Sequence, residues 1–242
     1  MWNLMLSVLS YLRGVFKLPN NVLNPADDDE YKKRFATLYS HFLGTSATFY
    51  SWKGLQKSDY QPLYNRAKYF WGSVLTALQN EWIISLAKCF EESSYSRRNE
   101  VISVHALLKH YLQRHTDSNK AAKVKALLKK HKRVISNITQ LRHKLAHIDA
   151  EYFNNPSDFL KKYPVDFGEV QDLLADFEDL LSSLNPESGV GYSLNNYVKT
   201  PEWEAGHVMD EIQFFVDEEA KHFERYSAGE TDNQFLPSRK TP

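Results

Sequence analysis

Apolar side chains recur at intervals of three and four residues along this sequence, and that spacing constrains the fold more than any other feature. The first such row reads Phe35, Leu38, Phe42, Thr45, Phe49 and Trp52. Because residues three or four apart share one face of an α-helix, each row predicts a helix with a buried face. Strand-like alternation of useful length is absent, so the sequence predicts an all-α fold.

Caps, prolines and glycines divide these rows into separate helices. The expected ranges are about 28–52, 62–90, 101–114, 119–148 and 166–184, with a last helix starting at Thr200. The 62–90 helix is apolar on most of its circumference, which predicts a central place in the fold. The 119–148 helix would be roughly 45 Å long. A helical bundle with additional C-terminal helices is the most economical arrangement.

Both ends of the chain differ from this middle. Residues 1–26 are expected to form an amphipathic segment, residues 27–226 a single helical domain and residues 227–242 a disordered tail. Arg13 and Lys17 follow the apolar part of the first segment, whereas a signal peptide has its basic residues in front. No apolar run approaches the roughly 20 residues that span a bilayer, so no membrane partner is expected. The lone Cys89 fits a reducing cytoplasm.

Charge is distributed unevenly although the net charge is zero. Residues 118–148 hold nine Lys and Arg and no acid, whereas residues 149–225 hold eighteen Asp and Glu and five Lys and Arg. Such asymmetry indicates a polyanion partner for the basic part. A plainer interpretation of this asymmetry is that the two segments attract each other or that the charges lie on solvated faces. From charge alone, the plainer interpretation is favoured.

Two residues interrupt the apolar stripe of the basic helix. The expected inward stripe is Val124, Leu128, His131, Ile135, Ile138, Arg142 and Leu145, broadened by Leu127, Val134 and Leu141. Arginine is rarely buried unless it is paired. Arg142 is therefore expected to meet a carboxylate, to open into a cleft or to lie at a subunit interface. Its position alone does not separate a core salt bridge, with Glu81 as a candidate partner, from a functional site.

The residues after Arg142 point to chemistry on RNA. His147 follows five residues later, which on an ideal helix is 140° and about 7.5 Å away, so the two side chains would flank a groove. Histidine transfers protons near neutral pH, and arginine binds phosphate through two hydrogen bonds. If the ribose 2′-hydroxyl is the nucleophile, cleavage needs no metal. Basic side chains nearby would attract the RNA backbone, namely Lys129, Lys130, Arg133 and Lys144.

Residues 142–147 read Arg-His-Lys-Leu-Ala-His, which resembles the signature of the HEPN superfamily: Arg, a polar residue, three more residues and His near the end of a helix. Ile148 and Asp149 behind it, and the aromatic helix with Tyr69, Phe70 and Trp71 before it, look like the abortive-infection branch. The resemblance covers about residues 30–185.

This resemblance implies a dimeric HEPN-like helical bundle in which two motifs form one composite cleft. It implies a metal-independent endoribonuclease that acts as a toxin or antiphage-defence effector, with RNA as substrate and an antitoxin or regulatory protein as a possible partner. Arg142 would stabilise the phosphate, His147 would be the acid/base residue and His143 would assist. Glu81 on the preceding helix would be the acid that supports Arg142.

Other features limit this interpretation. Some relatives carry a modifiable tyrosine two positions after the last histidine, but Asp149 stands there and Tyr152 lies beyond it, so regulation through that tyrosine is not expected. His143 and His147 are four residues apart without a third metal ligand in the pattern, so neither a metal nor a cofactor is expected. The alternative function is a non-catalytic HEPN-like module that binds protein or nucleic acid, because a fold does not guarantee activity.

Overall fold

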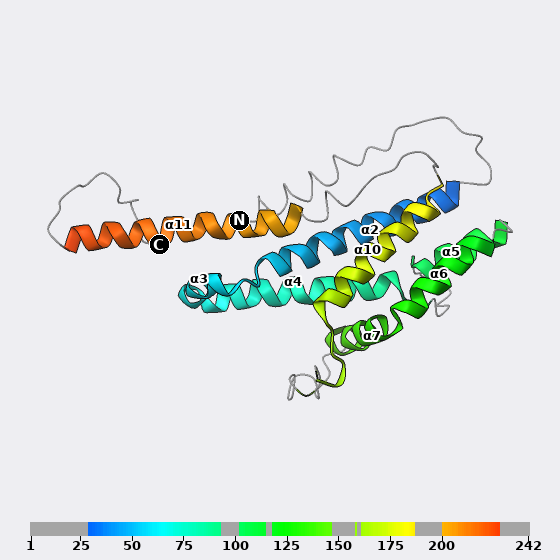
Figure 1. Cartoon of the computed structure of the whole chain (residues 1–242), viewed down its shortest axis with the longest axis horizontal. Coiled ribbons are helices and arrows are strands. Elements are labelled where there is room, and N and C mark those ends of the chain that lie inside the picture. The colour runs from blue at the N-terminus through cyan, green and yellow to red at the C-terminus, as the bar shows by residue number, and fades with distance from the viewer. Residues whose placement is uncertain are drawn as a thin grey trace. The chain divides into compact units, whose positions relative to one another are not determined.

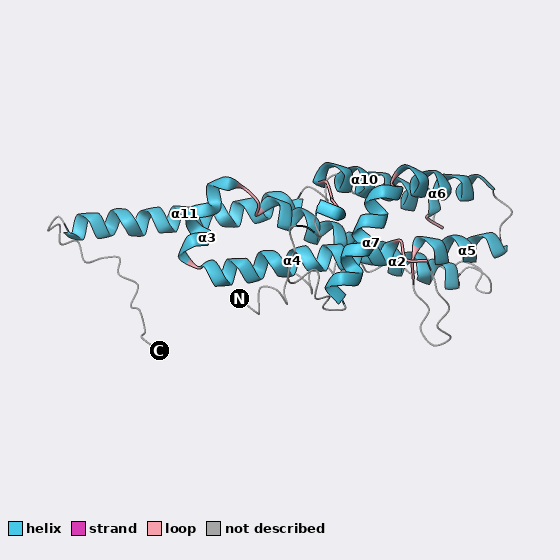
Figure 2. Cartoon of the chain, turned by 90° about the horizontal axis from the view of Figure 1, so that it is seen from below, coloured by secondary structure: helices cyan, strands magenta, loops and turns pink. Residues whose placement is uncertain are grey.

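The computed structural model describes residues 29–92, 102–114, 118–146, 158, 161–186 and 200–227. Within these ranges the chain forms helices and no strand, which confirms the all-α prediction (Figure 2). Contacts divide the chain into units 1–30 and 31–242, and apart from Asp29 and Glu30 the described residues belong to the second. The expected segment 1–26 lies outside the described residues, as does the tail after Ser227.

The helix boundaries follow the sequence signals closely in several places. In chain order the elements are α2 Asp29–Gly54, the 3₁₀ turn η1 Ser58–Tyr60, α3 Gln61–Arg66, α4 Lys68–Cys89, α5 Val104–Arg114, α6 Ser118–Lys130, α7 Lys132–Ala146, α10 Phe167–Leu184 and α11 Thr200–Ser227 (Figure 1). Asp166 caps α10, because its side chain accepts a hydrogen bond of 3.0 Å from the Glu169 amide. This cap lies where the sequence places the start of that helix, and α2 ends two residues beyond its expected end.

Aromatic side chains from α2, α4 and α10 form the centre of the main core. Phe42 packs edge-on against Phe177 with ring centres 5.1 Å apart, and Phe49 does the same against Trp82 at 5.3 Å. All four are fully buried. Burial of each such side chain stabilises the fold by roughly 2–3 kcal/mol. The bulky residues of the sequence therefore supply the core that its apolar rows predict.

The expected single helix over 62–90 is two helices. The chain leaves the helical conformation at Ala67, with φ −136° and ψ 53°, and α4 starts at Lys68. This break lets η1 and α3 turn back, so that Tyr60 and Leu63 join Leu55 and Met209 of α11 in a second, smaller core. The expectation that this whole stretch is central also needs correction. Its C-terminal part from Trp82 to Cys89 is largely buried, but its beginning is exposed.

The expected 45 Å basic helix is also divided, and α6 and α7 meet at His131 (Figure 1). Backbone hydrogen bonds continue through the junction, since the His131 amide donates to Leu127 O and the Ile135 amide donates to His131 O, each at 3.0 Å. The bend lets α6 pack against α10 while α7 packs along α4. A straight helix would not follow both surfaces.

Gly54 permits a close approach between α2 and the start of α11. A Cβ built on Gly54 would lie 2.5 Å from the backbone oxygen of Glu202, too close for any side chain. The neighbouring Lys53 reinforces this joint, because its ammonium group donates to the Glu202 carboxylate at 3.0 Å. Among the described residues, no helix combines the length and the apolar character needed to cross a membrane.

The two glycines of α2 give a matched test of this packing. Gly54→Ala should destabilise the protein by about 1–3 kcal/mol, because the new methyl group meets backbone that has to shift. Gly44→Ala should instead stabilise it by about 0.5–1 kcal/mol, because that position lies inside the helix and has open space around it. Thermal unfolding followed by circular dichroism measures both. Equal shifts of the same sign would contradict the close approach at Gly54.

Candidate functional site

Arg142 lies near the end of α7 and is held from across the bundle. Its Nη1 donates a hydrogen bond of 3.0 Å to Oε1 of Glu91, which follows the C-terminal end of α4. The Arg142 side chain is 21% exposed, so it is half-buried and still reachable from solvent. A charge-assisted bond in such a setting fixes the direction of the guanidinium.

The acid that pairs with Arg142 is therefore Glu91 and not the expected Glu81. Glu81 lies ten residues earlier on α4, which is roughly 15 Å along the helix. Its exposed carboxylate accepts a hydrogen bond of 2.8 Å from the Ser85 hydroxyl. The expected acid lies within a helix, whereas the acid that Arg142 contacts is the first one after that helix ends. The position of Glu91 directly after the expected 62–90 helix is the sequence feature that could have identified it as the partner of Arg142.

The centre of the buried stripe also differs from the expected one. The fully or nearly buried row of α6 and α7 is Val124, Leu127, His131, Val134, Ile138 and Leu141. Leu128, Ile135 and Arg142, which were expected at the centre, are only half-buried. Arg142 is thus one position, or 100° of helix, beyond the most buried row. It lies at the margin of the core, where a charged group needs less compensation than at its centre.

The rest of the motif is only partly within the described residues. His143 is exposed and Lys144 is half-buried on the last turn of α7. The helix is described to Ala146, so His147 lies outside the described residues. The groove between Arg142 and His147 therefore stays a prediction.

His131, the other polar residue in the stripe, belongs to a structural cluster. It is 6% exposed, and its Nε2 lies 2.6 Å from Oδ2 of Asp176 on α10. Lys130 donates to the same oxygen at 2.5 Å. Although burial raises the pKa of Asp176, the hydrogen bonds and positive charges of Lys130 and His131 outweigh it and hold that pKa below its ordinary value. This cluster fastens the bend between α6 and α7 to α10.

The side chains expected to contact RNA fall into two groups. Lys130 pairs with Asp176, and Arg133 donates to the carboxylate of Glu169, also on α10. Lys129 is exposed, and Lys144 lies half-buried near the motif. Attraction between the basic and acidic segments, the plainer interpretation of the charge pattern, thus accounts for two of the four. Ion pairs this exposed contribute little to stability, because water and salt screen them.

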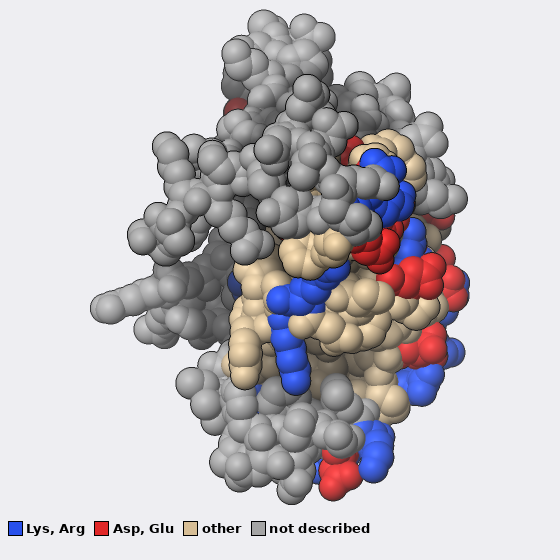
Figure 3. All heavy atoms as spheres, turned by 90° about the vertical axis from the view of Figure 1, so that its left-hand side faces the viewer, with Lys and Arg blue, Asp and Glu red and all other residues tan. Residues whose placement is uncertain are grey.

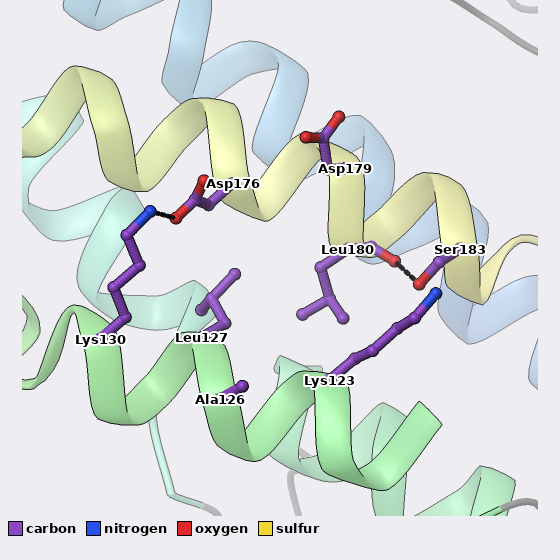
Figure 4. A pocket seen from close by; sticks show the side chains of 8 residues that line it. All are labelled: Lys123, Ala126, Leu127, Lys130, Asp176, Asp179, Leu180 and Ser183. Atoms are coloured by element: carbon purple, nitrogen blue, oxygen red, sulfur yellow. Dashed lines mark hydrogen bonds and ion pairs between the residues drawn. The ribbon is translucent and has the colours of Figure 1, made fainter. Parts of the chain in front are cut away.

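A shallow groove of about 490 Å³ lies between α6 and α10. Its described lining is Lys123, Ala126, Leu127, Lys130, Asp176, Asp179, Leu180 and Ser183. Figure 4 shows Leu127 and Leu180 turned into the groove, Lys130 and Asp176 bridging it, and Asp179 turned away from α6. Neither Arg142 nor Glu91 belongs to this lining, so the groove is separate from the motif.

Metal and thiol chemistry have no evident place in the described part of the chain. Within it, no group of three or more His, Cys, Asp or Glu side chains could hold a metal ion. Cys89 is fully buried, and that burial raises the pKa of its thiol to about 12. A thiol with such a pKa stays protonated and unreactive at neutral pH, so Cys89 serves as a small core residue.

Comparison with protein families gives one match. The model of the family HEPN_AbiU2, described as AbiU2, matches residues 28–191, which is more than half of the chain. The match spans α2 to α10 and therefore includes both Glu91 and the Arg142 motif. No curated protein and no solved structure matches the sequence.

The Asp176 cluster predicts a pH-dependent stability. A carboxyl group whose pKa is lowered on folding stabilises the protein fully above its unfolded-state pKa, ordinarily 3.8, and loses this contribution as the pH falls through the lower folded-state value. Asp176→Asn should therefore destabilise the protein by about 1–2 kcal/mol at neutral pH. The difference from the unmodified protein should shrink below about pH 4.

Urea unfolding between neutral and acid pH measures this difference. Asp179→Asn is the matched control, because Asp179 is exposed on the same helix and its carboxylate points away from α6 (Figure 4). It should change stability by less than about 0.5 kcal/mol at any pH. An Asp176→Asn protein as stable as this control would contradict the role of the cluster.

Proposed function

This chain belongs to the AbiU2 family of abortive-infection HEPN proteins, and from that premise we propose that it is a metal-independent endoribonuclease with Arg142 and His147 as its catalytic pair. The observation that carries the proposal is the placement of Arg142. It is half-buried near the end of α7 and oriented by Glu91, five residues before His147. A fixed cation beside a proton-transfer group is what cleavage of a phosphodiester requires.

In the proposed reaction the ribose 2′-oxygen attacks the adjacent phosphorus while its proton passes to a base. The bond from phosphorus to the 5′-oxygen breaks, and that oxygen takes a proton from an acid. The products are a 2′,3′-cyclic phosphate and a 5′-hydroxyl. His147 would act as the acid or base, and the adjacent His143 would assist. Arg142 would bind the non-bridging oxygens as negative charge develops on them.

Glu91 would act as a positioning residue in this scheme. A guanidinium has five N–H donors, so the bond from Nη1 to Glu91 is compatible with simultaneous contacts to phosphate. Because the two groups lie on different helices, the ion pair also fixes the end of α7 relative to the end of α4. The catalytic cation would then already be oriented when RNA arrives, which lowers the barrier.

The proposal includes a homodimer that brings two motifs into one cleft, as the family resemblance implies. RNA would approach along the exposed Lys129 and the half-buried Lys144 next to the motif. Lys130 and Arg133 would contribute less, because Asp176 and Glu169 already neutralise them. A toxin or antiphage effector of this kind acts in the cytoplasm and needs control by an antitoxin or regulatory protein.

A second candidate function is a non-catalytic HEPN module that binds protein or nucleic acid. The pairing of Lys130 and Arg133 with α10 favours it, since it removes positive charge from the surface expected to attract RNA. In that case the bond from Arg142 to Glu91 would serve mainly to hold α7 against the end of α4.

One assay separates these two functions. The purified protein is incubated with total RNA in the presence of a chelator, and the ends of the products are analysed. We expect cleavage with 2′,3′-cyclic phosphate ends. His147→Ala should reduce the rate by about 10²–10⁴-fold, the usual scale for loss of an acid/base group. RNA binding should change little, because most affinity comes from Lys and Arg contacts.

The folded state of the variant decides how the result is interpreted. A folded His147→Ala protein with full activity would defeat the ribonuclease assignment at this site. Loss of folding in that variant would instead favour a structural histidine. Absence of cleavage by the unmodified protein on any RNA would favour the non-catalytic module.

A further prediction distinguishes the two candidate acids. Glu91→Gln should lower kcat by about tenfold with a smaller effect on KM, because the guanidinium loses its charged partner and its fixed direction. Glu81→Gln is the matched control on the same helix and should leave kcat unchanged. Glu91→Asp should recover part of the activity. If Glu91→Gln and Glu81→Gln have the same kcat and KM, Glu91 has no role in the proposed site.

A further inference from the structure

The beginning of α4 and the end of α11 expose large apolar side chains. Tyr69 and Phe70 on α4 are 90% and 44% exposed, and Phe214, Phe215 and Phe223 on α11 are 60%, 69% and 71% exposed. Large exposed apolar side chains that gather on a surface often mark a site of interaction. We name these five residues the aromatic end surface. They call for a binding partner that covers them.

The second half of α11 lacks the packing that supports its first half. Met209, Ile212 and Val216 share a face and pack on the small core around Tyr60 and Leu63. After Val216 the described side chains are exposed, apart from the half-buried His222. Phe223 continues the same face seven residues later, and its side chain is 71% exposed.

Both views show this part of α11 running past α3 (Figures 1 and 2). A helix of about a dozen residues without packing is only marginally stable in water. Contacts with another surface would therefore stabilise this part of the molecule.

The two parts of the aromatic end surface carry opposite charge. Residues 60–80 contain no acid and include the exposed Arg66 and Lys68. Residues 210–227 contain six Asp and Glu and two Lys and Arg. In Figure 3, which faces this end, blue side chains lie within a broad uncharged area, and red and blue side chains alternate along one margin. The net charge of each part would complement that of the other part in a second copy, although Glu218 already pairs with Lys221 within α11 at 2.8 Å.

We propose that the aromatic end surface binds a second copy of this chain across a two-fold axis. The second half of α11 from each protomer would lie on the exposed start of α4 of its partner, so that the acidic part of α11 faces Arg66 and Lys68. One surface that carries both complementary parts is suited to such an isologous contact. Phe214 lies on the opposite side of α11 from Phe223, and the other four aromatic residues offer on the order of 400–600 Å² per protomer. That approaches the ~800 Å² per partner of a standard interface.

This contact is different from the composite cleft of the proposed function. Tyr69 stands near the start of α4 and Glu91 follows its end, so the two lie roughly 33 Å apart along the helix. Pairing through the aromatic end surface leaves Arg142 free to meet another motif. The inference therefore stands whether or not the chain cleaves RNA.

Sedimentation equilibrium of the full chain tests the proposal. Phe223→Ser should halve the mass of the assembly at micromolar concentration, or raise its dissociation constant by about 10–100-fold, because it removes a central aromatic contact. Leu112→Ser is the matched control, since Leu112 is a 44% exposed apolar residue on α5. It should leave the mass unchanged. Phe215→Ser is a second variant, and circular dichroism verifies that each protein is folded.

Charge reversal tests the orientation of the contact. Arg66→Glu with Lys68→Glu should weaken the assembly, and Glu218→Lys with Glu219→Lys should do the same. All four changes in one chain should restore it, because the two parts meet between copies. A monomeric unmodified protein, in which another segment or another protein covers the surface, would overturn the proposal. Equal masses for the Phe223→Ser and Leu112→Ser proteins, or no restoration in the fourfold variant, would also overturn it.

Discussion

His131 lies at the junction of α6 and α7 and is buried against Asp176 of α10. The position of Arg142 depends on this contact. A polar side chain in an apolar row has to find a partner, and Asp176 on α10 supplies it at 2.6 Å. With α6 fastened to α10, α7 is directed along α4. Arg142 near the end of α7 then reaches Glu91 just after the end of α4. The structural histidine and the candidate catalytic arginine are therefore linked through one bent helix pair.

The uneven charge of the chain serves two purposes in this arrangement. Asp176 and Glu169 of α10 neutralise Lys130 and Arg133, so part of the basic segment stabilises the packing of neighbouring helices. Lys129 and Lys144 remain nearer to a surface that RNA could approach. Net charge over a segment therefore overstates how much of it is available to a polyanion. Only the ion pairs within the fold show how the charge is divided.

The two ends of α4 have different surroundings, which separates the two proposed sites in space. Its C-terminal part is buried beside α2 and α7, and the residue that follows this part orients Arg142. Its N-terminal part exposes Tyr69 and Phe70 next to α3. A rigid helix of this length keeps the proposed self-association surface away from the proposed site of cleavage. Assembly at one end thus need not block substrate at the other.

The sequence by itself determined the helical class, the HEPN family and the start of α10 at Asp166. The helical class and the start of α10 follow from local spacing and backbone chemistry. Only the tertiary structure decided where long helices break and which acid meets Arg142. The breaks at Ala67 and His131 arise because each half packs on a different neighbour. Glu81 and Glu91 are chemically identical, and only the place where α7 crosses α4 selects Glu91. Contacts between residues far apart in sequence are not encoded in the periodicity of either helix, since each periodicity reports a buried face and not its partner.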